Sequence, residues 1–498
     1  MRSTLMRHRL LRAGRVPRLA RGLWGEAEKG SADLTVALDV GVPPPAFVDT
    51  METKVCSARA RIPLQRAPSR VRRAQVTTLE NGLKVASCDL PLPCTTVGLY
   101  VGAGSAQEQV GGTAHVLQHM AFASSEGFSQ LKASVMTEQM GIAASIAGRE
   151  NMVYQIDTLK DLVPEAVELL GSSVFAPKFH SWEIDAAVAI AKKDLEERKN
   201  NHQLLLQEYS HAAAFGGRSP LGRALTGPAW QLDHVSSDVL SQFVTEQYTP
   251  ERSVLVAAGY DHDKLVLHAQ RLLGHLAPGT PIPPVASEYV GGEYRESADD
   301  PLSHFALAFK GASWKDDSLI PLCVLNTMMG GGTSFSAGGP GKGMYTRLYQ
   351  NILNRFAFCH AASVYNAVYD HEGIFGVYCA APAEYMGHLV TVICDEMAKM
   401  ASGVSATELG RAKNQLTSSL LMNLESRPIL FEDLGRQVLT YGHRIPPEEL
   451  MERISAVTAD DITSVAKQLL GSRPSVVVYG DATSVPRYDQ IAARFARG

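Results

Sequence analysis

The chain of 498 residues is longer than one hydrophobic core usually supports, so we expect at least two domains. Apolar residues make up 45% and charged residues 20%, as in ordinary globular proteins, and the net charge of −4 argues against a nucleic-acid-binding protein. The chain has no apolar run near the roughly 18 residues that span a bilayer. Its seven cysteines are scattered without a C-x-x-C pair, which disfavours a disulfide framework or a thiolate zinc site.

The first 25 residues contain seven arginines, and no acidic residue precedes Glu26. An arginine-rich, acid-poor segment that can form a short amphipathic helix is typical of a mitochondrial transit peptide, and we predict one over residues 1–25. The alternative is a basic arm without a targeting role. Residues 26–74 include three consecutive prolines, and we interpret them as an extended tether.

The first predicted element of the ordered chain is a hairpin. The stretch T-L-E-N-G-L-K-V-A-S, which begins at Thr77, predicts two strands joined by an Asn-Gly turn. A second boundary is predicted at P-G-T-P-I-P-P, where four prolines interrupt the pattern. We therefore predict an N-terminal domain over 75–277, a linker over 278–302 and a C-terminal domain over 303–498.

The two predicted domains share a pattern. Residues 235–259 and 457–480 each begin with a helix-capping Ser or Thr, continue with helical apolar spacing and end in a β-branched strand before a glycine. Upstream, residues 97–105 and 305–313 also match. Two matches in the same order are more than chance helix-strand similarity predicts, so we predict two homologous α/β (α+β) domains.

The first domain contains a degenerate zinc-peptidase motif, G-T-A-H-V-L-Q-H-M-A-F. His115 and His119 are four residues apart, which places them on one helix face at a spacing that suits a shared zinc ion. In the motif H-x-x-E-H the glutamate takes a proton from the metal-bound water, but here that position is Gln118. Because an amide cannot accept the proton, we predict that the chain has no catalytic residues of its own.

A zinc ion would need a third ligand, normally a carboxylate. Asp194, Glu196 and Glu197 follow His119 at a distance of about 75 residues and are the candidates. The alternative is a solvated helix face together with two hydrogen-bonding histidines. We favour this alternative and expect no bound metal, with these five residues as vestigial candidates.

The second domain contains a glycine-rich segment, G-G-G-T-S-F-S-A-G-G-P-G-K-G. It lacks the spacing of a phosphate-binding loop, because Ser336 stands five residues before Gly341 and Gly343 follows Lys342. A mobile lid over a polypeptide cleft is the better interpretation. The predicted substrate-binding residues are Gly330, Gly331, Gly332, Ser334, Phe335, Gly338, Gly339, Gly341, Lys342 and Gly343.

This glycine-rich segment and the five residues 350–354 resemble the α-subunits of the mitochondrial processing peptidase, within the pitrilysin-like superfamily. The resemblance covers roughly residues 75 to 498. Further matching segments are 79–87, 149–155, 211–223, 289–295 and 474–480.

The resemblance implies two layered domains, each a mainly antiparallel sheet packed with helices, on one side of a large cavity. It implies a non-catalytic subunit of a heterodimeric zinc metalloendopeptidase in the mitochondrial matrix, which binds presequences for cleavage by the β-subunit. Zinc is expected in the β-partner and no cofactor in this chain. Candidate acidic contacts for presequence arginines, whose alternative is ordinary surface carboxylates, are Asp370, Glu372, Asp395 and Glu396.

The chain departs from this family in one respect, since α-subunits usually lack the pair His115 and His119. The family also implies an alternative role, as a structural core subunit of the ubiquinol–cytochrome c reductase complex on the matrix side of the inner membrane. In some lineages one protein serves both roles. The intact glycine-rich segment favours processing, and Gln118 opposes a third alternative, a stand-alone zinc peptidase.

Overall fold

A computed structural model describes residues 73–279, 286–333 and 344–496. The predicted transit peptide over 1–25 and the tether up to residue 72 lie outside the described residues. The same holds for residues 280–285 of the proline-rich segment and 334–343 of the glycine-rich segment.

The first half of the chain builds a six-stranded sheet in the order β1-β2-β6-β3-β5-β4. Neighbouring strands are antiparallel except for the parallel pair β2 and β6. The predicted hairpin is present, with Thr78 paired to Lys84, and Gly82 in its turn has a φ of +88°. The strands are β1 (Gln75–Thr78), β2 (Lys84–Cys88), β3 (Cys94–Val101), β4 (Ile142–Ala147), β5 (Met152–Leu159) and β6 (Ser253–Ala258).

The second half builds another six-stranded sheet, in the order β7-β12-β8-β11-β10-β9. Its parallel pair is β7 and β12. The run β7-β12-β8-β11-β10 repeats the run β2-β6-β3-β5-β4, which confirms the predicted duplicated α/β fold. The strands are β7 (Gly292–Glu296), β8 (Ser303–Gly311), β9 (Gly331–Thr333), β10 (Ala361–Val368), β11 (Gly373–Ala381) and β12 (Ser475–Tyr479).

One strand lies where a linker was predicted. The expected linker, 278–302, contains β7, which pairs with β12 along its whole length. Its sequence, G-E-Y-R-E, is short and polar, and alternate residues are exposed at the edge of the sheet. Edge strands of this kind carry little of the hydrophobic signal on which sequence prediction depends.

The described residues form fifteen α-helices, and none has the length and hydropathy needed to cross a bilayer. The first half contributes α2 (Thr113–His119), α3 (Gln130–Met140), α4 (Val163–Phe175), α5 (Ser181–Lys199), α6 (His202–Phe215), α7 (Ala229–Leu232), α8 (Ser237–Gln247) and α9 (His262–Leu273). The second contributes α10 (Leu319–Met329), α11 (Ala383–Lys399), α12 (Ala406–Glu425), α13 (Arg427–Tyr441), α14 (Pro447–Ala456), α15 (Ala459–Leu470) and α16 (Tyr488–Phe495).

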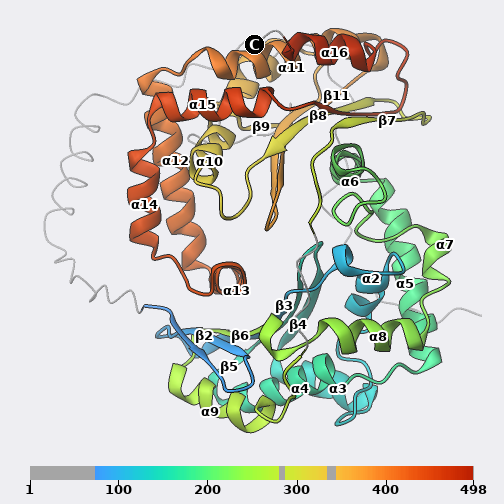
Figure 1. The fold of residues 1–498 in the computed structure, drawn as a ribbon, viewed down its shortest axis with the longest axis vertical. Helices are drawn as coiled ribbons and strands as arrows, with labels where there is room; N and C mark the ends of the chain where they lie inside the picture. Colours follow the sequence, from blue (N-terminus) through green and yellow to red (C-terminus); the bar gives the residue numbers. More distant parts are fainter. Residues whose placement is uncertain (1–72, 280–285, 334–343, 497–498) are drawn as a thin grey trace, which may run out of the picture. The chain divides into compact units, whose positions relative to one another are not determined.

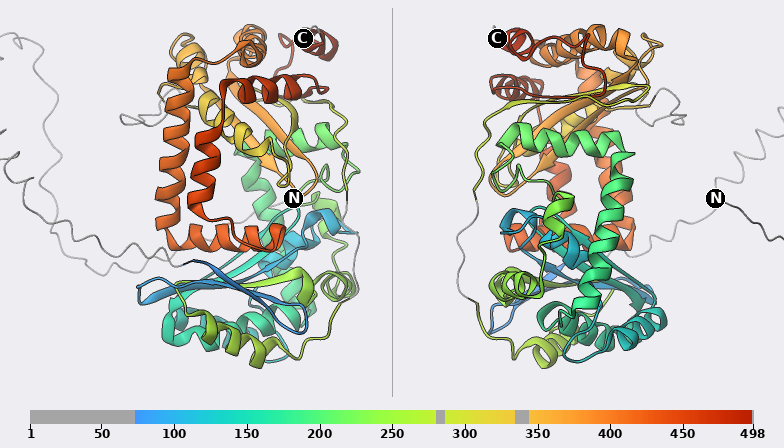
Figure 2. Two further views of the ribbon diagram at one scale, coloured as in Figure 1. Left: turned by 60° about the vertical axis from the view of Figure 1, so that its left-hand side comes forward. Right: turned by 90° about the vertical axis from the view of Figure 1, so that its right-hand side faces the viewer.

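Each half contributes one helix that packs on the sheet of the other half. We call these two helices, α6 and α13, the exchanged helices. Helix α5 leads from the first half to the second, where α6 packs on β7, β8 and β12 (Figures 1 and 2). Helix α12 leads back in the same way, and α13 packs on β2, β3 and β6. Helix α6 occupies the same position in the order of helices and strands of the first half as α13 does in the second half. The exchange of helices is therefore part of the duplicated pattern.

The exchanged helices bury apolar side chains. Phe431 of α13 is fully buried against Tyr100 of β3, with ring centroids 5.3 Å apart. Leu206 of α6 is fully buried among residues of the second sheet, and Tyr365 of β10 donates a hydrogen bond of 2.7 Å to Ser210. The two halves are therefore joined through hydrophobic cores rather than through a polar surface contact.

Candidate functional site

The histidine pair stands on α2, a short helix whose beginning is fixed by a buried carboxylate. Glu108 accepts hydrogen bonds from the backbone N–H groups of Gly112, at 2.8 Å, and Ala114, at 2.6 Å. Gly112 has a φ of +91°, and a Cβ there would lie 2.4 Å from Leu232, so glycine is required. Burial raises the pKa of Glu108 to about 8, although the two N–H donors and Arg223 oppose this shift.

The two histidines converge on one of the three predicted carboxylates. Oδ2 of Asp194, on α5, lies 3.0 Å from Nε2 of His119 and 3.5 Å from Nε2 of His115. The two Nε2 atoms are 3.2 Å apart. Glu196 and Glu197 are exposed and pair instead with lysines of α5, so the structure does not bring them to the cluster.

The cluster fits a divalent metal in number and spacing. Ligand atoms about 2.0 to 2.2 Å from a tetrahedral zinc lie about 3.3 Å from one another, close to the distances above. Burial, followed by the neighbouring His119, lowers the pKa of His115 to about 4, which favours the neutral, ligating form. However, Nδ1 of His115 is buried without a hydrogen-bond partner in the described part of the chain, so the bond that usually orients a zinc-ligating imidazole is missing.

Gln118 ties α2 to the edge strand β4. Its side-chain oxygen accepts a hydrogen bond of 3.0 Å from the backbone N–H of Ala147, and its backbone oxygen accepts one from Ser145. The amide therefore has a structural partner. It supplies no carboxylate next to the histidine pair, so a water at this cluster would have no glutamate at position 118 to take its proton.

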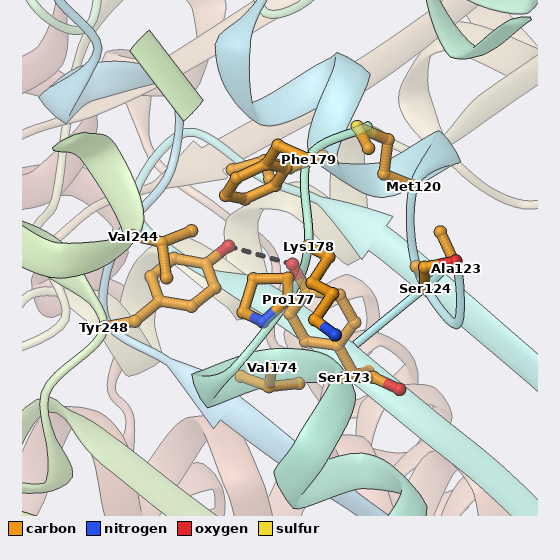
Figure 3. A pocket seen from close by; sticks show the side chains of 13 residues that line it. Met120, Ala123, Ser124, Ser173, Val174, Pro177, Lys178, Phe179, Val244 and Tyr248 are labelled. Atoms are coloured by element: carbon orange, nitrogen blue, oxygen red, sulfur yellow. Dashed lines mark hydrogen bonds between the residues drawn. The ribbon is translucent and has the colours of Figure 1, made fainter. Parts of the chain in front are cut away.

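A small cavity lies behind the apolar face of α2, next to Met120 (Figure 3). Tyr154 and Tyr248 both line it, and their hydroxyls are hydrogen-bonded at 2.9 Å. Its volume of about 10 Å³ is close to the space for one water molecule, so this cavity is a feature of packing and not a substrate site.

A much larger cleft of about 650 Å³ lies between residues of the two halves. From the first half it is lined by Lys84, Gly102, Gln107, Gly148, Arg149, Glu150, Asn151, Thr249, Glu251, Arg252 and Gly279. From the second half it is lined by Trp314, Lys315, Val368, Tyr369, Asp370, His371, Arg436, Leu439 and Thr440. Backbone, aromatic and charged groups of both signs thus face a common space of a size that suits a peptide segment.

Two acidic residues of the two halves, Glu150 and Asp370, are joined in this cleft. Both oxygens of Glu150 accept from the backbone N–H of Asp370, at 2.9 and 3.2 Å. The Asp370 carboxylate pairs with Lys315 at 2.7 Å. Burial raises the pKa of Glu150 to about 7, and the charge of Asp370 adds to the shift while its N–H opposes it. Sequence reasoning missed Glu150, although it lies within the matching segment 149–155.

The cleft wall is braced by the exchanged helix α6. Arg149 is buried and donates to Glu208 of α6 at 2.9 Å and to the backbone oxygen of Leu221 at 3.2 Å. His211 of α6 is hydrogen-bonded through Nε2 to the hydroxyl of Tyr369 at 2.7 Å. These bonds hold the segments that carry Glu150 and Asp370 to one helix.

The four predicted acidic contacts separate in space. Asp370 lines the cleft. Glu372 pairs with Lys310 at 2.9 Å, and Asp395 pairs with Arg494 at 3.2 Å while remaining exposed. Glu396 is buried and accepts from Asn351 and Lys399. Asp370 is therefore the member of this set that lines the large cleft.

The glycine-rich segment starts at the edge of the second sheet. Gly330 has a φ of +54° and Gly331 a φ of +118°. A Cβ at Gly331 would lie 2.1 Å from the backbone oxygen of Ala362, so pairing of β9 with β10 requires glycine there. Gly332 also lies in β9. The other seven predicted substrate-binding residues lie outside the described residues, namely Ser334, Phe335, Gly338, Gly339, Gly341, Lys342 and Gly343.

Comparison with known proteins places the sequence of this chain in a family. Residues 84–229 match the family model "Insulinase (Peptidase family M16)", and residues 234–416 match "Peptidase M16 inactive domain". The chain is 41% identical over 431 residues to the mitochondrial-processing peptidase subunit alpha of Solanum tuberosum, with 85% of each chain covered. It is 35% identical to the subunit of that name from Bos taurus, with 85% of each covered, and 34% identical to that from Homo sapiens, with 84% of each covered.

Proposed function

Because the chain belongs to the mitochondrial-processing peptidase α-subunit family, within peptidase family M16, we propose that it is the non-catalytic subunit that binds presequences for cleavage by a β-subunit. The names of its relatives describe one subunit of a mitochondrial peptidase. They support a location in mitochondria and a partner subunit. In this proposal the partner is catalytic and forms a heterodimer with this chain in the matrix.

Gln118 carries the non-catalytic part of the proposal. His115, His119 and Asp194 have the spacing of metal ligands, yet the position of the proton acceptor holds an amide that is hydrogen-bonded to Ala147. A zinc ion at this cluster would lack the base that activates water. The catalytic zinc is accordingly assigned to the partner, and none to this motif.

The cleft between the halves supports the substrate-binding part. Presequences are rich in arginine, and the acidic residues Glu150 and Asp370, joined through the backbone N–H of Asp370, line a cleft of about 650 Å³. An arginine brought to Glu150 would stabilise the charged form of a carboxylate that burial now disfavours. The glycine-rich segment, which begins at β9, is proposed to close over the bound peptide.

The three relatives compared above, which match over most of the chain, carry processing-peptidase names. This favours the processing role over the role of a structural core subunit in ubiquinol–cytochrome c reductase.

Reconstitution tests the proposal. The purified chain alone is expected to leave a fluorescent presequence peptide intact, and addition of the β-subunit is expected to give cleavage. The peptide should nevertheless bind to the isolated chain. Metal-dependent hydrolysis by the isolated chain, abolished in His115→Ala, would contradict the non-catalytic role, and absence of peptide binding would contradict the recognition role.

A further inference from the structure

A second group of metal-ligating side chains lies where the exchanged helix α6 meets the second sheet. His202 is the first residue of α6, Asp300 precedes β8, and His304 is the second residue of β8. Each offers one ligand atom, and these atoms lie within 4.8 Å of one another. His202 comes from the first half of the chain and the other two from the second half, so the group joins the halves.

The distances suit one ion. Nε2 of His202 lies 3.0 Å from Oδ2 of Asp300. Nε2 of His304 lies 3.6 Å from Oδ1, the other oxygen of the same carboxylate. These distances bracket the separation of about 3.3 Å between ligand atoms around a tetrahedral zinc. The two imidazole rings are stacked, with centroids 4.1 Å apart, and the Nε2 atoms of both lie beside the Asp300 carboxylate.

His304 shows why an ion pair alone does not account for the group. Its side chain is 4% exposed, and its Nε2 is buried without a hydrogen-bond partner in the described part of the chain. A buried polar atom without a partner costs free energy. A protonated His202 beside Asp300 would leave this atom unsatisfied, whereas a metal would use its lone pair together with the other two ligands.

The surroundings orient the ligands for a metal. The hydroxyl of Tyr378 is hydrogen-bonded to Nδ1 of His304 at 2.8 Å, the kind of outer bond that directs Nε2 of an imidazole to a metal. The backbone N–H of Leu302 donates to Oδ1 of Asp300 at 3.0 Å. The side chains of His202 and Asp300 are 25% and 19% exposed, which leaves a path for entry and a position for water.

We propose that His202, Asp300 and His304 form a binding site for a divalent transition metal of the zinc class, which fastens the start of α6 to β8 of the other half. Two imidazoles and one carboxylate suit zinc better than magnesium or calcium, which prefer oxygen ligands. The site is independent of the proposed presequence-binding role, and it would be an exception to the expectation that this chain holds no cofactor.

Zinc titration of the full chain in the His119→Gln background tests the site, because that change removes a ligand of the other histidine cluster. One equivalent of Zn²⁺ is expected to bind and to raise the midpoint of thermal unfolding. Asp300→Asn, which retains an acceptor for Leu302, is expected to weaken binding by more than about tenfold and to abolish the thermal shift.

The matched control is Asp299→Asn, which removes the same charge at the neighbouring exposed residue and should leave zinc binding unchanged. His202→Gln is a second loss variant, and the N-cap residue Asn201 remains to start α6. The proposal is overturned if the His119→Gln chain binds no Zn²⁺, or if Asp300→Asn binds it as tightly as Asp299→Asn.

Discussion

The side-chain oxygen of Gln118 accepts a hydrogen bond from the backbone N–H of Ala147, at 3.0 Å. In an active relative, the residue at position 118 would be the proton acceptor. Here its side chain makes a hydrogen bond that links α2 to the edge strand β4. The position thus has a structural use that does not depend on catalysis.

Gln118→Ala should destabilise the chain without affecting cleavage by the heterodimer. The change leaves the N–H of Ala147, a buried residue, without its acceptor, at a cost of about 1 to 3 kcal/mol in the free energy of unfolding. Urea unfolding of the isolated chain measures this cost. Gln118→Glu keeps an acceptor and serves as the control, and an equal loss in both variants would show that the bond is not the cause.

Deletion of residues 334–343 should weaken presequence capture and leave heterodimer assembly intact. The deletion spares β9, so the pairing of Gly331 and Gly332 with β10 survives. Binding of a fluorescent presequence and size-exclusion chromatography with the β-subunit are the two measurements. A deletion variant that binds the peptide as the parent does would remove the segment from substrate recognition.

Capture of arginine-rich peptides should weaken as the pH falls from about 8 to 6. Glu150, whose pKa burial raises to about 7, loses its negative charge in this interval, and attraction to guanidinium groups is lost with it. Glu150→Gln should reduce affinity at pH 8 by about tenfold, the effect of roughly 1.4 kcal/mol, and flatten the pH dependence.

Asp395→Asn is the control for this cleft. It removes an acidic residue of the second half that is exposed and paired with Arg494, outside the lining of the cleft, so affinity and its pH dependence should stay unchanged. An equal effect of Asp395→Asn and Glu150→Gln would mean that net charge, and not the cleft, attracts the peptide.

Acidification below pH 6.5 should destabilise the fold through His211. Burial, followed by the neighbouring Arg149, lowers the pKa of His211 well below 6.5. The unfolded chain therefore takes up a proton that the folded chain refuses, so stability falls with falling pH, by up to about 1.4 kcal/mol per pH unit. For His211→Gln, the free energy of unfolding measured at several pH values should depend less steeply on pH. Replacement of the exposed His443 should leave this pH dependence unchanged.

The cluster of His115, His119 and Asp194 should hold zinc weakly. The missing partner at Nδ1 of His115 leaves the imidazole without its orienting bond. Elemental analysis of the isolated chain should give the same zinc content for the parent and for His115→Ala. One zinc lost per chain in that variant would show that these three side chains suffice.

The sequence predicted the repeated strands and helices well, because their apolar periodicity and caps are local signals. The degenerate motif was also evident, since Gln118 stands within it. Glu150 was missed because its burial depends on Asp370, a contact 220 residues away in the chain. The group of His202, Asp300 and His304 was missed for the same reason, as its members come from different halves. The strand β7 was missed because a polar edge strand has too little apolar pattern.

Between two separate chains, the exchange of α6 and α13 would be called domain swapping. Within one chain it means that neither half can be a self-sufficient folding unit. The first half made alone would expose the sheet face that Phe431 covers, and the second would expose the face that Leu206 covers. Substitutions on either face must therefore be accommodated by the other half. After the duplication, the two copies could no longer evolve as independent modules, and a chain severed between them should still assemble from its two fragments.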